Sequence, residues 1–195
     1  MDLRCFIAIP VPDQIRRNIG DQIDNLKTFQ ADVKWVASGN LHITLKFLGA
    51  TPESLIPDIK EALSSIALSY RQFSITLSGA GCFPAVKYPR VLWVGAEDSG
   101  MMARLQKEID DTLSSFGFAK EVKIFHPHLT IGRVRSQKEI SRMMGVFESL
   151  RSINFGAFAA CGIHIIKSEL KPKGAEYTSL HEIPFMPERK ETLTV

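Results

Sequence analysis

Cysteine is scarce in this 195-residue chain, and long hydrophobic runs are missing. Its three cysteines, Cys5, Cys82 and Cys161, are odd in number and widely separated, so they indicate neither a disulfide framework nor a zinc site. No segment is long and apolar enough to span a bilayer, and the apolar run at 5–9 is too short for a signal peptide. These features predict a cytoplasmic protein without a membrane anchor.

The composition is that of an ordinary globular protein. Hydrophobic residues make up 45% of the chain and charged residues 23%, with a formal net charge of +3. The chain can therefore bury a sizeable core, and its mild basicity leaves room for a local surface that attracts an anionic substrate. We expect residues 1–186 to form one bilobal domain, followed by a polar tail at 187–195.

Helical and extended patterns alternate along the chain. An apolar stripe at Ile15, Ile19, Ile23 and Leu26 predicts the first helix. Further helices are predicted at 52–68, 101–116 and 137–150, and strands at 5–9, 33–36, 41–48, 73–77, 91–94, 124–134, 157–166 and 177–183. The segment 79–84 is rich in turn residues and reads as a loop.

One tetrapeptide pattern is present twice. His42-Ile43-Thr44-Leu45 and His128-Leu129-Thr130-Ile131 both read His, apolar, Thr, apolar. Two His-x-Thr matches among five histidines and nine threonines are expected by chance in only about 2% of similar chains. Each copy lies in a predicted strand, which places the imidazole and the hydroxyl on one face and the apolar residues on the other.

The two copies lie almost half a chain length apart, one in each half. This spacing predicts an α+β fold with two pseudo-symmetric lobes. We expect each lobe to be a mainly antiparallel sheet with helices on its outer face. The active-site cleft would then lie between the two sheets.

Two histidines and two threonines suit a phosphoester reaction. A neutral imidazole can take a proton from water, and an imidazolium can give one to a leaving oxygen. Because the ordinary pKa of histidine is near 6.5, both forms exist near neutral pH. Hydroxyl donors can bind the non-bridging oxygens of the phosphoryl group.

A metal site is the alternative interpretation of the second motif. His126 and His128 have a chelating i, i+2 spacing, but no acidic or cysteine cluster supplies further ligands. We therefore predict no metal and no cofactor, with His126 at the edge of the cleft or packed.

Several cations and aromatic residues are weaker candidates. Arg133 could bind phosphate, although strict alternation places it on the face opposite His128 unless Gly132 marks a bulge. Strand alternation places Lys46 on the same face as His42, where it could add positive charge to the site. It could equally be a solvated residue at the end of the strand. A loose basic set could hold an RNA backbone; it consists of Lys167, Lys171, Lys173 and Arg135. Four aromatic residues could stack a base, namely Phe6, Phe47, Phe125 and Tyr177. Core packing is the favoured role for the three phenylalanines.

The paired motifs resemble those of the two-histidine phosphoesterase superfamily. Within it the chain is similar to the RNA 2',3'-cyclic phosphodiesterase, or 2'-5' RNA ligase-like, family. The likeness covers nearly the whole chain, including 4–9, 42–49, 89–93, 127–133 and 168–177. Gly132 departs from the family pattern, where alanine is frequent.

The resemblance implies a metal-free enzyme that hydrolyses a terminal 2',3'-cyclic phosphate on RNA to a 2'-phosphomonoester. It makes His42 the proton donor and His128 the proton acceptor. From the chemistry of their hydroxyls, we predict Thr44 and Thr130 as phosphate-binding residues. The implied partner is an RNA or oligonucleotide with such an end, and the protein is expected to be a monomer. The rival interpretations are 2'-5' RNA ligation, a metal-dependent hydrolase, and an RNA-binding module without turnover.

Overall fold

The computed structural model describes residues 1–172 and 174–188. Lys173 and positions 189–195 of the predicted tail therefore lie outside the described residues. The α-helices are α1 (Asp13–Lys27), α2 (Ile56–Ala67), α3 (Met101–Ser114) and α4 (Ile140–Ser149). The strands are β1 (Asp2–Pro10), β2 (Val33–Trp35), β3 (His42–Pro52), β4 (Phe73–Ala85), β5 (Tyr88–Glu97), β6 (His128–Val134), β7 (Asn154–Ala160), β8 (Gly162–Lys171) and β9 (Gly174–Pro184).

The strands form a single curled sheet. Their order is β7-β4-β5-β6-β3-β1-β8-β9, with β2 paired to β6, and every strand pair is antiparallel. Leaving β2 aside, four strands of this order lie on each side of the boundary between β6 and β3, where Ile43 pairs with Leu129. The α+β class and the two related halves are confirmed, but the two expected sheets are one continuous sheet.

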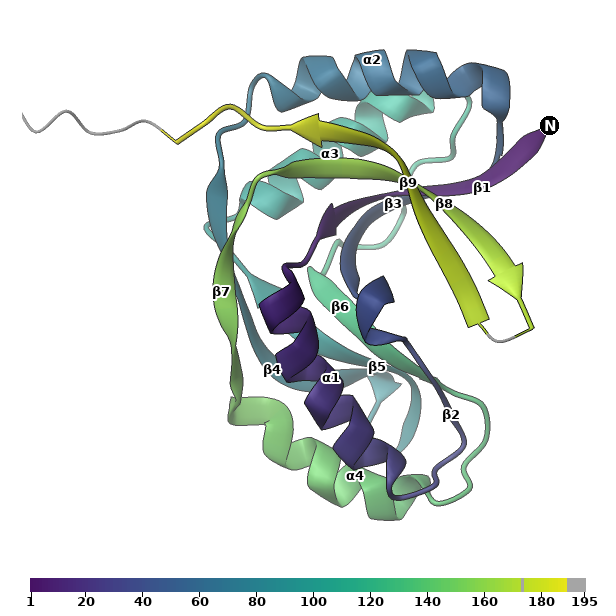
Figure 1. Ribbon diagram of the computed structural model, residues 1–195, viewed down its shortest axis with the longest axis vertical. Helices are drawn as coiled ribbons and strands as arrows, with labels where there is room; N and C mark the ends of the chain where they lie inside the picture. The colour runs from purple at the N-terminus through teal and green to yellow at the C-terminus, as the bar shows by residue number, and fades with distance from the viewer. Residues whose placement is uncertain (173, 189–195) are drawn as a thin grey trace, which may run out of the picture.

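Two helices cover the outer face of each half (Figure 1). Helices α2 and α3 pack on the half that contains β3, β8 and β9, whereas α1 and α4 pack on the half that contains β4 and β7. Helix α1 begins directly after β1 but contacts β7, so it crosses from one half to the other. None of the described helices combines the length and the apolarity that a membrane span requires.

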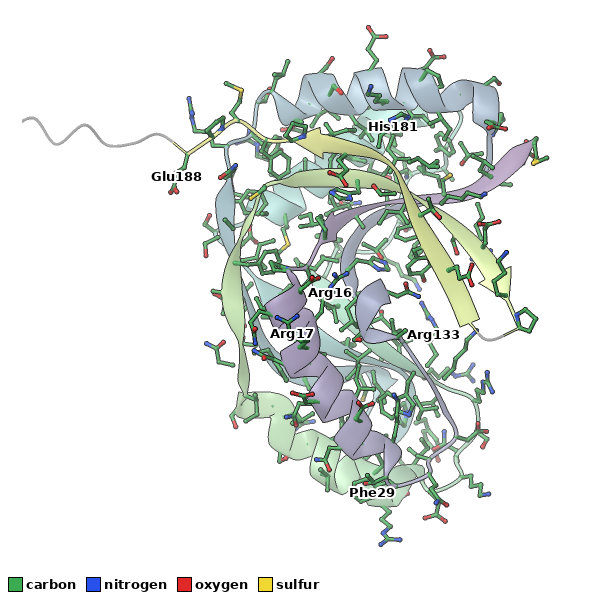
Figure 2. The ribbon with its side chains drawn as sticks, viewed as in Figure 1. Arg16, Arg17, Phe29, Arg133, His181 and Glu188 are labelled. Atoms are coloured by element: carbon green, nitrogen blue, oxygen red, sulfur yellow. The ribbon has the colours of Figure 1, made fainter. Side chains whose placement is uncertain are left out.

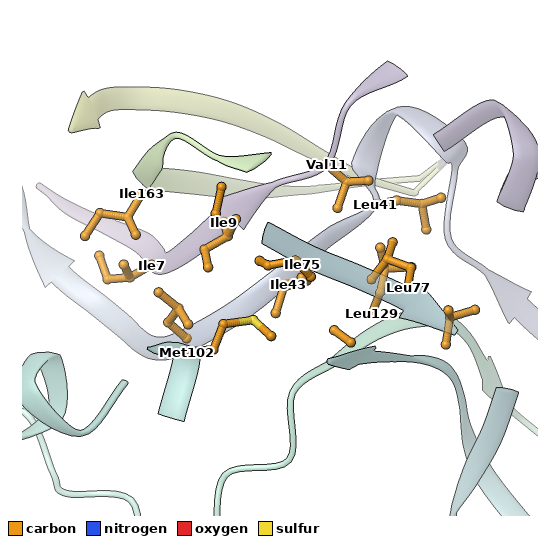
Figure 3. Packing of buried hydrophobic residues seen from close by; sticks show 14 of the residues in the cluster. Ile7, Ile9, Val11, Leu41, Ile43, Ile75, Leu77, Met102, Leu129 and Ile163 are labelled. Atoms are coloured by element: carbon orange, nitrogen blue, oxygen red, sulfur yellow. The ribbon is translucent and has the colours of Figure 1, made fainter. Parts of the chain in front are cut away.

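The main core lies between the sheet and these helices. Figure 3 shows Ile7, Ile9, Ile43, Leu129 and Met102 packed together near the junction of the two halves. The apolar stripe of α1 is buried as predicted, from Ile15 to Leu26. Burying each such side chain stabilises the fold by roughly 1.5–3 kcal/mol before the entropy cost. The core therefore fixes the strands that carry the two motifs.

Three local predictions were wrong. Residues 79–84 are not a loop, because β4 continues through them to Ala85 and pairs with β5. Gly79 has φ +65 and lies at a register shift between β4 and β5, so this glycine allows an irregularity within the strand and does not form a turn. The strand predicted at 157–166 is two strands, β7 and β8, which are separated at Cys161. The strand predicted at 124–134 begins only at His128.

Candidate active site

The two tetrapeptides lie on neighbouring strands at the centre of the sheet. Because Ile43 pairs antiparallel with Leu129, His42 lies opposite Thr130 and Thr44 lies opposite His128. Ile43 and Leu129 are fully buried on the core side, so the four polar side chains share the other face. The two histidines are diagonal neighbours, about 7–8 Å apart in such a pairing, which leaves room for a phosphoryl group between them.

Each histidine is held by the same contact. His42 Nδ1 lies 2.7 Å from the carbonyl oxygen of Asn40, and His128 Nδ1 lies 2.7 Å from that of His126. A carbonyl can only accept, so Nδ1 carries the hydrogen in both rings. In the neutral form, Nε2 of each ring is therefore left with a free lone pair for proton transfer.

Aromatic rings pack against both imidazoles. The His42 ring lies 4.7 Å from Phe6 and 5.4 Å from Tyr177, measured between ring centroids. The His128 ring lies 5.3 Å from Phe83 and 6.4 Å from Trp93. These contacts restrict the motion of each imidazole and shield it from water.

Burial sets the direction of both pKa shifts. It lowers the pKa of His42, and the hydrogen bond to the Asn40 carbonyl partly opposes this effect. Burial also lowers the pKa of His128, where the carbonyl of His126 opposes it and the charges of Arg133 and His126 add to it. Both rings are therefore biased toward the neutral form.

A β-bulge lies at the last residue of each tetrapeptide. Ala8 pairs with Thr44 but Ile7 pairs with Lys46, so Leu45 is the extra residue on β3. Trp93 pairs with Thr130 but Leu92 pairs with Gly132, so Ile131 is the extra residue on β6. An extra residue reverses the alternation of side chains beyond it.

The first bulge turns Lys46 away from the site, so neither role predicted for it is correct. Lys46 is 2% exposed and lies in the core. Its ammonium group forms an ion pair with Asp110 of α3 and donates a hydrogen bond to the carbonyl of Ala119 at 2.8 Å. The bulge instead brings Phe47 onto the motif face, where it pairs with Phe6.

The second bulge turns Arg133 toward the site. On β5, Leu92 and Val94 are buried in the core, so Val91 and its partner Arg133 lie on the same face as Trp93 and Thr130. Figure 2 places Arg133 beside the β8–β9 hairpin. Its charge lowers the pKa of His128 and opposes the burial that raises the pKa of Tyr177 on that hairpin.

Sequence reasoning missed Phe83, Trp93 and the side chain of Asn40. Phe83 and Trp93 lie on strands that the sequence could not place beside the second motif. Asn40 stands two residues before His42, as His126 does before His128, and that shared offset was the available signal. Phe125 packs against the core as predicted, whereas Phe47 does not. The described residues include no group of three or more His, Cys, Asp or Glu side chains that could hold a metal ion.

Nearly the whole chain is similar to known proteins of one superfamily. Residues 11–171 match the family model of the 2'-5' RNA ligase superfamily. A protein from Methanocaldococcus jannaschii named RNA 2',3'-cyclic phosphodiesterase is 37% identical over 180 residues, covering 92% of this chain and 99% of that protein. One of the same name from Thermotoga maritima is 34% identical over 185 residues, covering 94% and 96%.

Solved structures share the fold. The crystal structure of TT0787 from Thermus thermophilus has a TM-score of 0.81 at 28% identity, and the match covers 96% of this chain and 100% of that one. E. coli LigT complexed with 3'-AMP has a TM-score of 0.72 at 26% identity, and the match covers 95% and 99%.

Proposed function

The chain belongs to the 2'-5' RNA ligase superfamily and, within it, to the RNA 2',3'-cyclic phosphodiesterase family, and on this premise we propose that it hydrolyses the terminal 2',3'-cyclic phosphate of RNA. The observation that carries the proposal is the antiparallel pairing of Ile43 with Leu129, which sets His42 opposite Thr130 and Thr44 opposite His128. It surrounds one position with two proton-transfer groups and two hydroxyl donors.

The reaction assigned to this site is an in-line displacement at phosphorus. Nε2 of His128 accepts a proton from water as the water oxygen bonds to phosphorus. The bond from phosphorus to the 3' oxygen breaks on the opposite side, and Nε2 of protonated His42 donates a proton to that oxygen. The products are a 2'-phosphomonoester and a free 3' hydroxyl, so atoms and charges balance.

Thr44, Thr130 and Arg133 are assigned to the phosphate. The two hydroxyls donate hydrogen bonds to its non-bridging oxygens, whose negative charge the site must stabilise in the transition state. The Arg133 guanidinium supplies a permanent positive charge near His128. Binding of the phosphate anion raises the pKa of His42, which favours the protonated form that a general acid requires.

We also propose that RNA is the substrate of a monomer in the cytoplasm. Cys5, Cys82 and Cys161 are all free, which suits a reducing compartment. The exposed large apolar side chains are spread over separate elements, with Leu68 after α2, Val122 and Ile124 before β6 and Leu170 on β8. Sedimentation at micromolar concentration tests the monomer, and a stable dimer would contradict it.

The deciding experiment measures turnover of a nucleoside 2',3'-cyclic monophosphate in excess chelator. We expect full wild-type activity, and a loss of about 10²- to 10⁴-fold in both His42→Ala and His128→Ala. His181→Ala is the matched control, because His181 lies beside α2 on the outer face (Figure 2). Loss of wild-type activity in chelator would refute the metal-free mechanism, and an active histidine variant would remove that residue from the chemistry.

A further inference from the structure

An exposed aromatic ring lies beside the proposed catalytic site. The bulge at Leu45 brings Phe47 onto the motif face, where its ring centroid lies 6.0 Å from that of Phe6. Phe6 is itself buried and packs against the His42 ring. Phe47 is 57% exposed, so the outermost ring of the series His42, Phe6, Phe47 presents much of its surface to solvent.

The exposed cation Arg4 lies on the same face of the sheet as this ring, two residues before Phe6 on β1. Cys5 and Ile7 of β1 point into the core, so Arg4 and Phe6 share the motif face. Arg4 is exposed and, among the residues that the structure describes, forms no ion pair. The charges of Arg4 on β1 and of Arg133 on β6 both oppose the burial that raises the pKa of Tyr177.

We propose that Phe47 and Arg4 form a subsite for the nucleotide that precedes the cyclic-phosphate end of a single-stranded RNA. The base of that nucleotide stacks on Phe47, and the phosphodiester that links it to the terminal nucleotide contacts Arg4. This assignment rests on the proposed function, because the subsite is defined relative to the reacting phosphate. It makes an oligoribonucleotide, and not a cyclic mononucleotide, the substrate that fits the protein best.

Substrate chemistry gives the direction of the chain. An RNA that ends in a 2',3'-cyclic phosphate has no nucleotide beyond that end, so every further contact is to the preceding nucleotides. Phe47 lies one ring beyond Phe6, which already contacts His42. An aromatic face with a neighbouring guanidinium is the combination by which proteins bind unpaired bases and their backbone.

A lone exposed phenylalanine is ordinary on a protein surface and would carry no conclusion by itself. Here the ring continues the aromatic packing that begins at His42, and the exposed Arg4 lies on the same face. A protein partner could pack against the apolar ring, but only an acidic partner would also interact favourably with Arg4. The terminal base is the competing occupant, and the experiment separates the two.

The test compares kcat/KM for a nucleoside 2',3'-cyclic monophosphate with that for a dinucleotide carrying the same end. We expect the wild type to prefer the dinucleotide. Loss of one stacked base costs about 1–3 kcal/mol, so Phe47→Leu should lower the ratio of the two values by about 5- to 150-fold. Phe47→Tyr, which retains a ring, should keep the ratio near that of the wild type.

Arg4→Ala should lower the same ratio and also change its salt dependence. Removal of one contact to a single strand should make the slope of log kcat/KM against log salt less steep by about 0.7 for the dinucleotide. Lys60→Ala and Leu68→Ala are matched controls, because they remove a cation and an exposed apolar side chain at α2 on the outer face. Both controls should retain the wild-type ratio.

The outcomes are distinct. If Phe47→Leu lowered kcat/KM equally for both substrates, the terminal base would lie on Phe47 and the proposal would be overturned. If neither Phe47→Leu nor Arg4→Ala changed kcat/KM for the dinucleotide relative to the mononucleotide, there would be no such subsite. A wild type that hydrolyses neither substrate would instead refute the proposed function. A wild type that hydrolyses both with equal kcat/KM would refute only the subsite.

Discussion

The side-chain amide of Asn40 donates a hydrogen bond to the backbone carbonyl of Ala175 on β9, across 2.6 Å. The backbone carbonyl of the same Asn40 accepts the hydrogen of His42 Nδ1. Ala175 lies two residues before Tyr177, whose ring meets the His42 ring edge-on at 5.4 Å. One residue therefore connects the orientation of His42 to the hairpin that covers it.

Asn40→Ala should loosen the hairpin while leaving the carbonyl contact to His42 in place. Tyr177 would then shield His42 less, and the pKa of His42 should rise toward its ordinary value because burial is what lowers it. The lost hydrogen bond is worth about 0.5–1.5 kcal/mol, so kcat/KM should fall roughly two- to tenfold. An NMR titration of the His42 ring measures its pKa, and steady-state kinetics measure kcat/KM.

Asn18→Ala is the matched control, since Asn18 also donates from its side-chain amide to a backbone carbonyl, that of Phe155, away from the site. It should leave the His42 titration at its wild-type midpoint. If Asn40→Ala also left the midpoint unchanged, the Asn40 side chain would have no part in positioning His42 or its cover.

Stability should fall as pH falls below the ordinary pKa of histidine. The pKa of His42 and that of His128 are both lowered in the folded protein. The unfolded chain therefore binds protons first, so this stability is complete above about pH 6.5 and is lost as pH falls toward the folded values. Urea unfolding at pH 7.5 and 5.5 should show a smaller loss in the double variant His42→Gln/His128→Gln than in the wild type.

His164, whose pKa burial also lowers, should contribute equally to both proteins. The difference between them thus isolates the two site histidines. Identical losses in the wild type and the double variant would mean that neither site histidine is held in its neutral form by the fold.

The sequence was sufficient to predict the candidate site but not the register of the strands that carry it. Strand periodicity alone places each histidine beside its own threonine, and the repeated motif suggests two related halves. The sequence does not show that the strands of the two motifs are neighbours, nor that Ile43 pairs with Leu129. That register depends on long-range packing of the core, and it decides that each histidine faces the threonine of the other motif.

The β-bulges explain the largest errors around the site. Strict alternation predicted Lys46 on the face of His42 and Arg133 away from His128, and each bulge reverses one of these placements. The sequence did suggest a bulge near Gly132, but the extra residue is Ile131. Nothing in the sequence marked Leu45, because the next residue is Lys46 and not a glycine, and the buried Asp110 that pairs with Lys46 lies on a distant helix.

Lys46→Met should strongly destabilise the protein. It leaves the Asp110 carboxylate buried without its cation, and breaking such a pair from one side costs about 3–5 kcal/mol. Asp110 still accepts hydrogen bonds from the backbone amide of Glu121 at 3.2 Å, which is too little to balance a buried charge. The free energy of unfolding in urea gives the cost directly.

Lys60→Met is the control, because Lys60 is exposed on α2 and should cost little. In the Lys46→Met background, Asp110→Asn should recover part of the lost stability by removing the unpaired charge. If Lys46→Met proved as stable as Lys60→Met, the ion pair would contribute nothing to the fold.

The assignment of the acid and the base can be tested with a modified leaving group. A substrate whose 3' bridging oxygen is replaced by sulfur releases a thiolate, which needs no proton from a general acid because its pKa is near 8.5. On this substrate His42→Ala should recover most of the activity that it loses on the oxygen substrate, whereas His128→Ala should not, since water must still lose a proton. Recovery in His128→Ala alone would exchange the two roles. Recovery in neither variant would mean that His42 does more than protonate the leaving oxygen, and that its positive charge next to the phosphate also matters.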